Sequence, residues 1–292
     1  MRLIAKAGLA AVLALLAAAP PALAGSPNLA RGPQTLAEMD RAAPEGRAVQ
    51  VVVDTPQIGA TVEIGRVIAD FSAGSKITAL TSMAQREADF AITPLRTALK
   101  DYDASAKALD AAKAGLAAVP WLNPAPLETA VQPGATQPLD FIAVAKTPTV
   151  GLVRIGYYLS PDATRIEARA DLEIVRKARK GGGAVTVLVL QHVTSAVVLD
   201  KPSFVVRENV TRWSANDGEL ARSAIGRALG QLRDLIPQSL ALDAGKVAGF
   251  ATRTDMAQAA GRFGPVVERG TAGPGSMVIW SKGLVGVMPA SN

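Results

Sequence analysis

The chain has 292 residues, a formal net charge of +6 and a single histidine, and it contains no cysteine. These features exclude disulfides, thiolate metal sites, a cysteine nucleophile and any motif that needs two histidines. The positive charge is mild, whereas nucleic-acid binding favours a concentrated basic stripe, so no nucleic-acid partner is predicted.

The first 24 residues have the pattern of a secretory signal peptide. Arg2 and Lys6 precede a short apolar core at 7–18, and Ala22-Leu23-Ala24 matches a small-residue cleavage site. We therefore expect cleavage between Ala24 and Gly25. An uncleaved anchor or a hydrophobic N-terminal helix is the alternative.

Cleavage would remove two positive charges and leave a formal charge of +4. The product is expected to be periplasmic or secreted. It is not expected to be a lipoprotein, because lipidation needs a cysteine after the signal. No apolar run after residue 24 is long enough to cross a bilayer, which needs about 20 residues, so no transmembrane span is predicted after cleavage.

The mature chain begins with a segment that favours no regular structure. Residues 25–47 are predicted to form an extended lead-in, and a single α+β domain is predicted over 48–292, with a possible linker at 123–138. The β-branched run at 48–53 predicts a buried strand. Residues 58–72 fit either a helix or a strand, with the helix slightly favoured.

Two helices are predicted next, arranged as an α-helical hairpin. Pro94 lies inside the first apolar pattern, which predicts a kink or a new helix start there. Asp103 or Ser105 can cap the second helix, over 104–118, and Pro120 stops it. Apolar residues recur at helical spacing along the first of the two: Ile77, Leu80, Ala84, Ala88, Ile92, Leu95 and Leu99.

The sequence after the proline-rich segment 123–138 favours β-structure. Strands are predicted over 139–145 and 150–159, followed by a turn at Ser160-Pro161-Asp162. Residues 165–175 alternate strictly, with apolar side chains at even positions and mainly charged ones at odd positions, which predicts one buried and one solvated face. With a further long run at 185–199, these strands suggest an antiparallel meander.

The last quarter is predicted to hold a helix and short strands. A third helix is predicted over 216–236, because Asn216 and Glu219 have capping-box spacing and Pro237 follows. A strand at 265–268 and a hairpin over 277–287 complete the pattern.

Short motifs resemble a group of uncharacterised exported bacterial proteins. The resemblance covers about residues 90–235; it implies a family domain, and it implies no activity and no site residue. The motifs are Pro94-Leu95-Arg96, Asp101-Tyr102-Asp103, Pro120-Trp121-Leu122, Tyr158-Leu159-Ser160-Pro161-Asp162 and Trp213.

The only histidine, His192, lies in a predicted strand. With Ser195 and an aspartate it could form a Ser-His-Asp triad, but the chain has no G-x-S-x-G elbow and no Ser-x-x-Lys pair. A sheet-face histidine satisfied by a neighbour or by water is therefore predicted.

Acidic residues occur in two suggestive places. Asp101 and Asp103 could share a cation, but helix capping explains them and a metal loop would need more oxygen ligands. Glu167, Asp171 and Glu173 could form catalytic pairs, but cross-strand charge pairing on a solvated face is favoured. No metal, cofactor or catalytic residue is predicted.

A basic loop is the most suggestive surface feature. Its four cations precede three glycines and could contact phosphates or anionic headgroups, while a solvated hairpin tip is the alternative. The cations are Arg176, Lys177, Arg179 and Lys180.

Together these patterns predict an α+β fold, with an antiparallel sheet packed by the helical hairpin and the third helix. The expected function is that of an exported, non-enzymatic cell-envelope protein with a binding or scaffolding role. Its partner would be an envelope protein or an anionic envelope component. A periplasmic carrier of a small apolar or lipidic ligand is the alternative, and a serine hydrolase built on Ser195, His192 and an aspartate ranks last.

Overall fold

The structure is a computed structural model that describes residues 33–54, 57–61, 74–131, 138–177 and 185–290. The predicted signal peptide, the Ala24–Gly25 cleavage site, residues 25–32 of the lead-in, residues 62–72, Arg179 and Lys180 lie outside these ranges. No helix among the described residues is long and apolar enough to cross a membrane.

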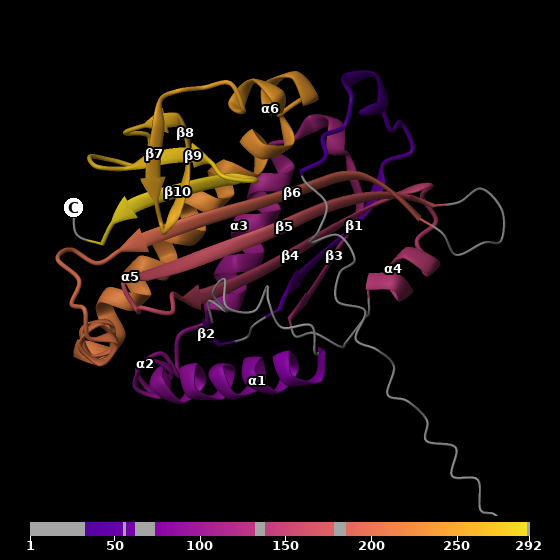
Figure 1. Cartoon of the computed structure of the whole chain (residues 1–292). Helices are drawn as coiled ribbons and strands as arrows, with labels where there is room; N and C mark the ends of the chain where they lie inside the picture. The colour runs from indigo at the N-terminus through magenta and orange to yellow at the C-terminus, as the bar shows by residue number, and fades with distance from the viewer. Residues whose placement is uncertain (1–32, 55–56, 62–73, 132–137, 178–184, 291–292) are drawn as a thin grey trace, which may run out of the picture. The chain divides into compact units, whose positions relative to one another are not determined.

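Ten strands of the described chain form one sheet (Figure 1). Its order is β3-β1-β4-β5-β6-β10-β9-β8-β7, and β2 pairs with β4 beside the end of β1. The strands are β1 (Arg47–Val53), β2 (Gly59–Ala60), β3 (Pro124–Val131), β4 (Thr149–Leu159), β5 (Arg165–Lys177), β6 (Val185–Val198), β7 (Met256–Ala259), β8 (Arg262–Arg269), β9 (Met277–Trp280) and β10 (Leu284–Pro289).

The sheet is mixed, and the predicted α+β class is confirmed. Strands β4, β5 and β6 form the predicted antiparallel meander, and β7 to β10 pair antiparallel in sequence order. However, β1 runs parallel to β3 and β4, and β10 runs parallel to β6. Strands brought together through long helical connections can pair in parallel, which the short-range antiparallel pattern does not reveal.

The helices are α1 (Gly74–Ala91), α2 (Thr93–Ala98), α3 (Ala104–Ala117), α4 (Pro138–Val144), α5 (Val206–Leu240) and α6 (Ala244–Phe250), with short 3₁₀ turns η1 (Glu38–Asp40) and η3 (Pro120–Leu122). Helices α3 and α5 lie against one face of the sheet, behind it in Figure 1. Helix α2 follows a break at Ile92 with Pro94 in its first turn, as predicted. Helices α2 and α3 are consecutive, and each packs on α5.

The core lies between the sheet and these helices. The even residues of β5, from Ile166 to Ile174, are all buried, as the alternation predicts. They belong to a cluster built mainly from Ala, Val, Leu and Ile, in which Trp213 of α5 is fully buried. The aromatic content of the chain is low, at 4%, and Trp213 is the largest fully buried side chain among the described residues.

Two segments differ from the predictions around residue 138. Pro124–Val131 is strand β3 and not a loop; it lies at the edge of the sheet, where prolines are tolerated. The predicted strand 139–145 is instead helix α4, which starts at Pro138 with Asp140 in its first turn. Phe141 and Ile142 of this helix pack against Val150, Leu152 and Val175 on the sheet face opposite α5. A short apolar run is ambiguous between strand and buried helix, and here the tertiary contact decides.

The predicted helix 216–236 is part of a longer element. Helix α5 runs from Val206 to Leu240, with a non-helical break at 215–218. Asn216 has a φ of 50° and so lies in the left-handed region, which asparagine tolerates; it does not sit at an extended N-cap. Pro237 does not end the helix, because it falls in the last turn and buried Ile236 and Leu240 hold that turn against the core.

Candidate functional site

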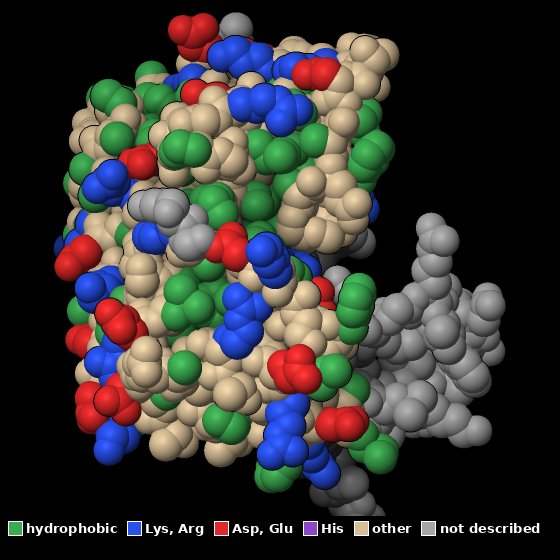
Figure 2. All heavy atoms as spheres, turned by 90° about the vertical axis from the view of Figure 1, so that its left-hand side faces the viewer, with side chains coloured by type: hydrophobic (Ala, Val, Ile, Leu, Met, Phe, Trp, Pro, Cys, Tyr) green, Lys and Arg blue, Asp and Glu red, His purple; other side chains and the backbone are tan. Residues whose placement is uncertain are grey.

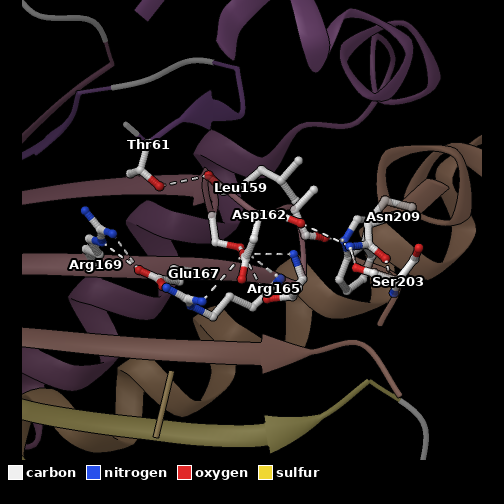
Figure 3. A network of polar contacts seen from close by, with 12 residues as sticks. Thr61, Leu159, Asp162, Arg165, Glu167, Arg169, Ser203 and Asn209 are labelled. Carbon is white, nitrogen blue, oxygen red and sulfur yellow. Dashed lines mark hydrogen bonds and ion pairs between the residues drawn. The ribbon is translucent and has the colours of Figure 1, made fainter. Parts of the chain in front are cut away.

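A buried carboxylate lies on the charged face of β5. Glu167 is 1% exposed and is held by two arginines of the same strand. Arg165 donates from Nε to Glu167 Oε1 at 2.6 Å, and Arg169 donates to Oε2 from Nε at 2.9 Å and from Nη2 at 2.6 Å (Figure 3). Glu167 and the two arginines occupy alternate positions, so they share one face of the strand.

This geometry corrects the expected solvated face. Arg165 and Glu167 are buried, and Glu167 pairs with arginines of its own strand, whereas Asp171 contacts His192 across the strands, on β6. Arg262 of β8 reaches the same face and donates to Thr194 Oγ1 of β6 at 3.2 Å. Burial lowers the pKa of Arg262, and the charge of Glu167 offsets part of that effect. Asp171 remains exposed, as predicted.

The cluster of Glu167, Arg165 and Arg169 is suited to stabilising the fold rather than to acid–base chemistry. Burial alone would raise the pKa of Glu167, but the charges and hydrogen bonds of Arg169 and Arg165 outweigh it, and the net shift is downward. A carboxylate that stays ionised, with both oxygens engaged by guanidinium groups, is a poor general acid or base at neutral pH.

Replacing Glu167 with glutamine is expected to lower the free energy of unfolding by about 2 kcal/mol at neutral pH, because it leaves two arginines without their counter-charge. Because the pKa of Glu167 is lower in the folded state than in the unfolded state, its ionisation stabilises the fold at every pH above the unfolded-state pKa. This stabilisation is lost as the pH falls through the folded-state pKa. The difference between Glu167→Gln and the wild type should therefore shrink on acidification below about pH 4.5.

Urea unfolding across a pH series measures this difference. Glu128→Gln, at an exposed carboxylate of edge strand β3, is the matched control and should change little. A pH-independent gap between wild type and Glu167→Gln would contradict the ion-pair account.

A second polar centre, at Asn209, holds the loop that precedes α5. This side chain is fully buried. Its Nδ2 donates to Asp162 O at 3.0 Å and to Ser203 O at 2.8 Å, while its Oδ1 accepts from Ser203 N at 2.8 Å (Figure 3). Asn209 thus ties the β4–β5 turn at 160–164 to the loop at 199–205. Trp213 of α5 also holds this turn, by donating from Nε1 to Ala163 O at 2.9 Å.

The loop held by Asn209 presents three consecutive apolar residues to solvent. We call Phe204, Val205 and Val206 the apolar tip; they are 107%, 51% and 38% exposed. Ser203 Oγ accepts from Val205 N at 3.0 Å, and Arg212 donates to Lys201 O at 2.9 Å and Asp200 O at 2.8 Å. Phe204 is the most exposed large apolar side chain among the described residues, and two further exposed apolar residues follow it directly. Contiguous exposed apolar groups, unlike single ones, are typical of interaction surfaces.

The remaining predicted residues fall in separate places. His192 is on the sheet face, as predicted, with Nδ1 2.7 Å from Asp171 Oδ1. Ser195, three residues along β6, points to the opposite face, where its Oγ donates to Gln231 Oε1 at 2.7 Å. Because residues an odd number apart lie on opposite faces of a strand, His192 cannot activate Ser195. The structure therefore does not assemble the Ser195–His192 pair.

The acidic and basic candidates also have structural partners. Asp103 caps α3 by accepting from Ala106 N at 3.0 Å, which confirms helix capping for this residue. Asp101 caps none of the described helices; it is exposed, with Oδ2 4.0 Å from Lys100 Nζ. Among the described residues no group of three or more carboxylates or histidines could hold a metal ion. Of the basic loop, Arg176 is exposed and Lys177 donates to Ala145 O at the end of α4.

A cleft of about 280 Å³ opens between α2, α3 and the sheet. Polar side chains contribute much of its wall, including Arg96, Lys100, Tyr102 and Tyr157. Arg96 is already paired with Asp89 at 2.6 Å and donates to Ile58 O at 3.0 Å. A second cavity, beside Val49 and Leu116, holds only about 10 Å³. Neither offers the apolar, enclosed space that a lipidic ligand requires.

Figure 2 shows the side of the molecule that lies at the left in Figure 1. Lysine and arginine side chains are interspersed there with aspartate and glutamate, and hydrophobic side chains lie between them. The described side chains on this face therefore do not form the continuous basic stripe that a nucleic acid would favour.

Fold and site together define an α+β protein with a mixed sheet, a buried ion-pair cluster at Glu167 and an exposed apolar tip. Comparison with protein-family models, with curated proteins and with solved structures finds no match. Sequence reasoning missed both Asn209 and the apolar tip. The only local signal for the tip was an apolar triplet between Ser203 and the charged pair Arg207-Glu208.

Proposed function

We propose that this chain is an exported, non-enzymatic cell-envelope protein that binds another envelope component through the apolar tip. The observation that carries the proposal is the exposure of Phe204 on a loop fixed by Asn209. Leaving a phenylalanine side chain in water forgoes about 1.5–3 kcal/mol of burial energy, which a partner can supply. Export is supported by the signal-peptide pattern that ends at Ala24.

A preformed tip is better suited to binding than a disordered one. The loop is already ordered by Asn209 and Ser203, so little conformational entropy remains to be lost when a partner binds. The separation of Ser195 from His192 and the full engagement of Glu167 favour a binding role over hydrolysis. The polar cleft gives the lipid-carrier alternative no support.

Cell fractionation of the tagged full-length protein tests the proposal. We expect wild type to partition with the envelope fraction and Phe204→Ser to shift to the soluble exported fraction, because the substitution removes the main apolar contact. Phe90→Ser is the matched control: Phe90 is 81% exposed but lies on α1, away from the loop before α5 in sequence.

The control variant should partition like wild type, and all three proteins should have the same thermal midpoint, because neither phenylalanine is buried. If Phe204→Ser stays with the envelope as wild type does, the apolar tip is not the binding surface and the proposed function is wrong.

A further inference from the structure

We propose that the apolar tip inserts into a lipid surface that carries anionic headgroups. This inference rests on the proposed function, since it names the partner of the same surface. Three features support it: the shape of the tip, the hydrogen bonds of the loop backbone and the charges around the tip.

The tip is an exposed stretch of consecutive residues and not a groove. Phe204, Val205 and Val206 follow one another where the loop enters α5, at the lower left of Figure 1. An apolar protrusion suits the boundary of headgroups and acyl chains, where an aromatic ring is well accommodated. A protein partner would instead have to offer a concave pocket that matches all three side chains.

Several backbone groups on either side of Phe204 have internal hydrogen-bond partners. An unpaired N–H or C=O group is costly in a lipid environment, so a membrane-inserting loop needs internal partners. Ser203 N and O are both bonded to the Asn209 side chain, and Val205 N is bonded to Ser203 Oγ. Val205 O accepts from Glu208 N at 3.0 Å. Arg212 donates one hydrogen bond to the carbonyl of Asp200 and one to that of Lys201.

Cations flank the apolar residues on both sides. Lys201 precedes the tip, Arg207 follows it directly, and both are exposed. Two acidic residues lie beside these cations: exposed Asp200 precedes Lys201, and Glu208 follows Arg207 and accepts at Oε2 from Ser203 Oγ at 2.5 Å. With exposed Arg212 there are three cations against two carboxylates, so residues 200–212 carry a formal charge of +1. Lysine and arginine near a membrane surface favour anionic lipids, so these cations and the tip would act together.

Vesicle flotation of the mature protein tests the inference with two lipid mixtures. One contains phosphatidylcholine and phosphatidylglycerol, and the other contains phosphatidylcholine alone. We expect wild type to float with the anionic vesicles and more weakly with the neutral ones. Phe204→Ser should weaken binding to anionic vesicles on the order of tenfold or more, the size of effect expected from losing one buried aromatic side chain.

Two further variants separate the contributions. Phe90→Ser should bind as wild type does, because it removes an exposed ring elsewhere on the chain. The double variant Lys201→Gln/Arg207→Gln should lose the preference for anionic over neutral vesicles while keeping the residual binding through Phe204. The wild-type chain has three tryptophans, so the added quenching by brominated lipid in a Phe204→Trp variant relative to wild type reports whether this position enters the bilayer.

The outcomes distinguish this inference from the proposed function. If wild type binds neither mixture, or if Phe204→Ser binds as well as wild type, the lipid inference is wrong. If in that case Phe204→Ser still leaves the envelope fraction in cells, the tip binds a protein and the proposed function stands. If Phe204→Ser also stays with the envelope in cells, both are wrong.

Discussion

Replacing Trp213 with alanine is expected to lower the free energy of unfolding by about 4 kcal/mol. The side chain is fully buried in the core between α5 and the sheet, so its removal loses transfer energy and leaves a large cavity. The substitution also leaves Ala163 O without the hydrogen bond from Nε1. Urea unfolding followed by circular dichroism measures the loss.

Trp213→Phe separates the two contributions. It keeps an aromatic ring in the core and removes the Nε1 donor, so a loss of about 1–2 kcal/mol is expected. Because Trp213 and Asn209 hold the same turn, Trp213→Ala should also increase amide hydrogen exchange in the loop at 199–205. A loss below about 1 kcal/mol for Trp213→Ala would contradict the packing described here.

The core face of β5 could be predicted from the sequence, whereas the state of its other face could not. Alternation is a local property of a strand, so it identifies Ile166 and Leu172 as buried without knowledge of the fold. The burial of Glu167 depends on the rest of the sheet, including β8, which brings Arg262 to the same face. Charged residues at alternate positions, taken alone, predict a solvated strand face.

Helix limits were predictable where a local signal is strong. Asp103 caps α3 and Pro94 lies in the first turn of α2, because a cap and a proline act within a few residues. The start of α5 was missed: its first turns are rich in exposed charged residues, and its buried contacts, Asn209, Val210 and Trp213, are few. Parallel pairing of β1 and β10 depends on chain crossings that local periodicity does not record.

The candidate site was the least predictable part. An apolar triplet such as Phe204-Val205-Val206 would ordinarily be taken as a buried run, since exposure of large apolar side chains is unfavourable. Its exposure follows from Asn209, which fixes the loop through tertiary hydrogen bonds to Ser203 and Asp162. Neither the buried asparagine nor its partners carry a sequence pattern that marks this role.

Replacing Leu172 with aspartate is expected to cost about 4 kcal/mol or more at neutral pH. Leu172 is buried on the core face of β5, so the new carboxylate would be placed among apolar side chains without a hydrogen-bonding partner. Burial raises the pKa of such a carboxylate, because the charged form loses its hydration. Chemical denaturation at neutral pH measures the cost.

The neighbouring position provides the control. Glu173→Gln changes a partly exposed side chain of nearly the same shape on the opposite face, so it should alter stability by less than about 0.5 kcal/mol. The raised pKa of the carboxyl introduced by Leu172→Asp also makes the loss of stability depend on pH. The loss should decrease as the pH falls through that pKa, because burying the protonated acid costs less free energy than burying the carboxylate. Equal losses in the two variants would mean that the core face of β5 has been assigned incorrectly.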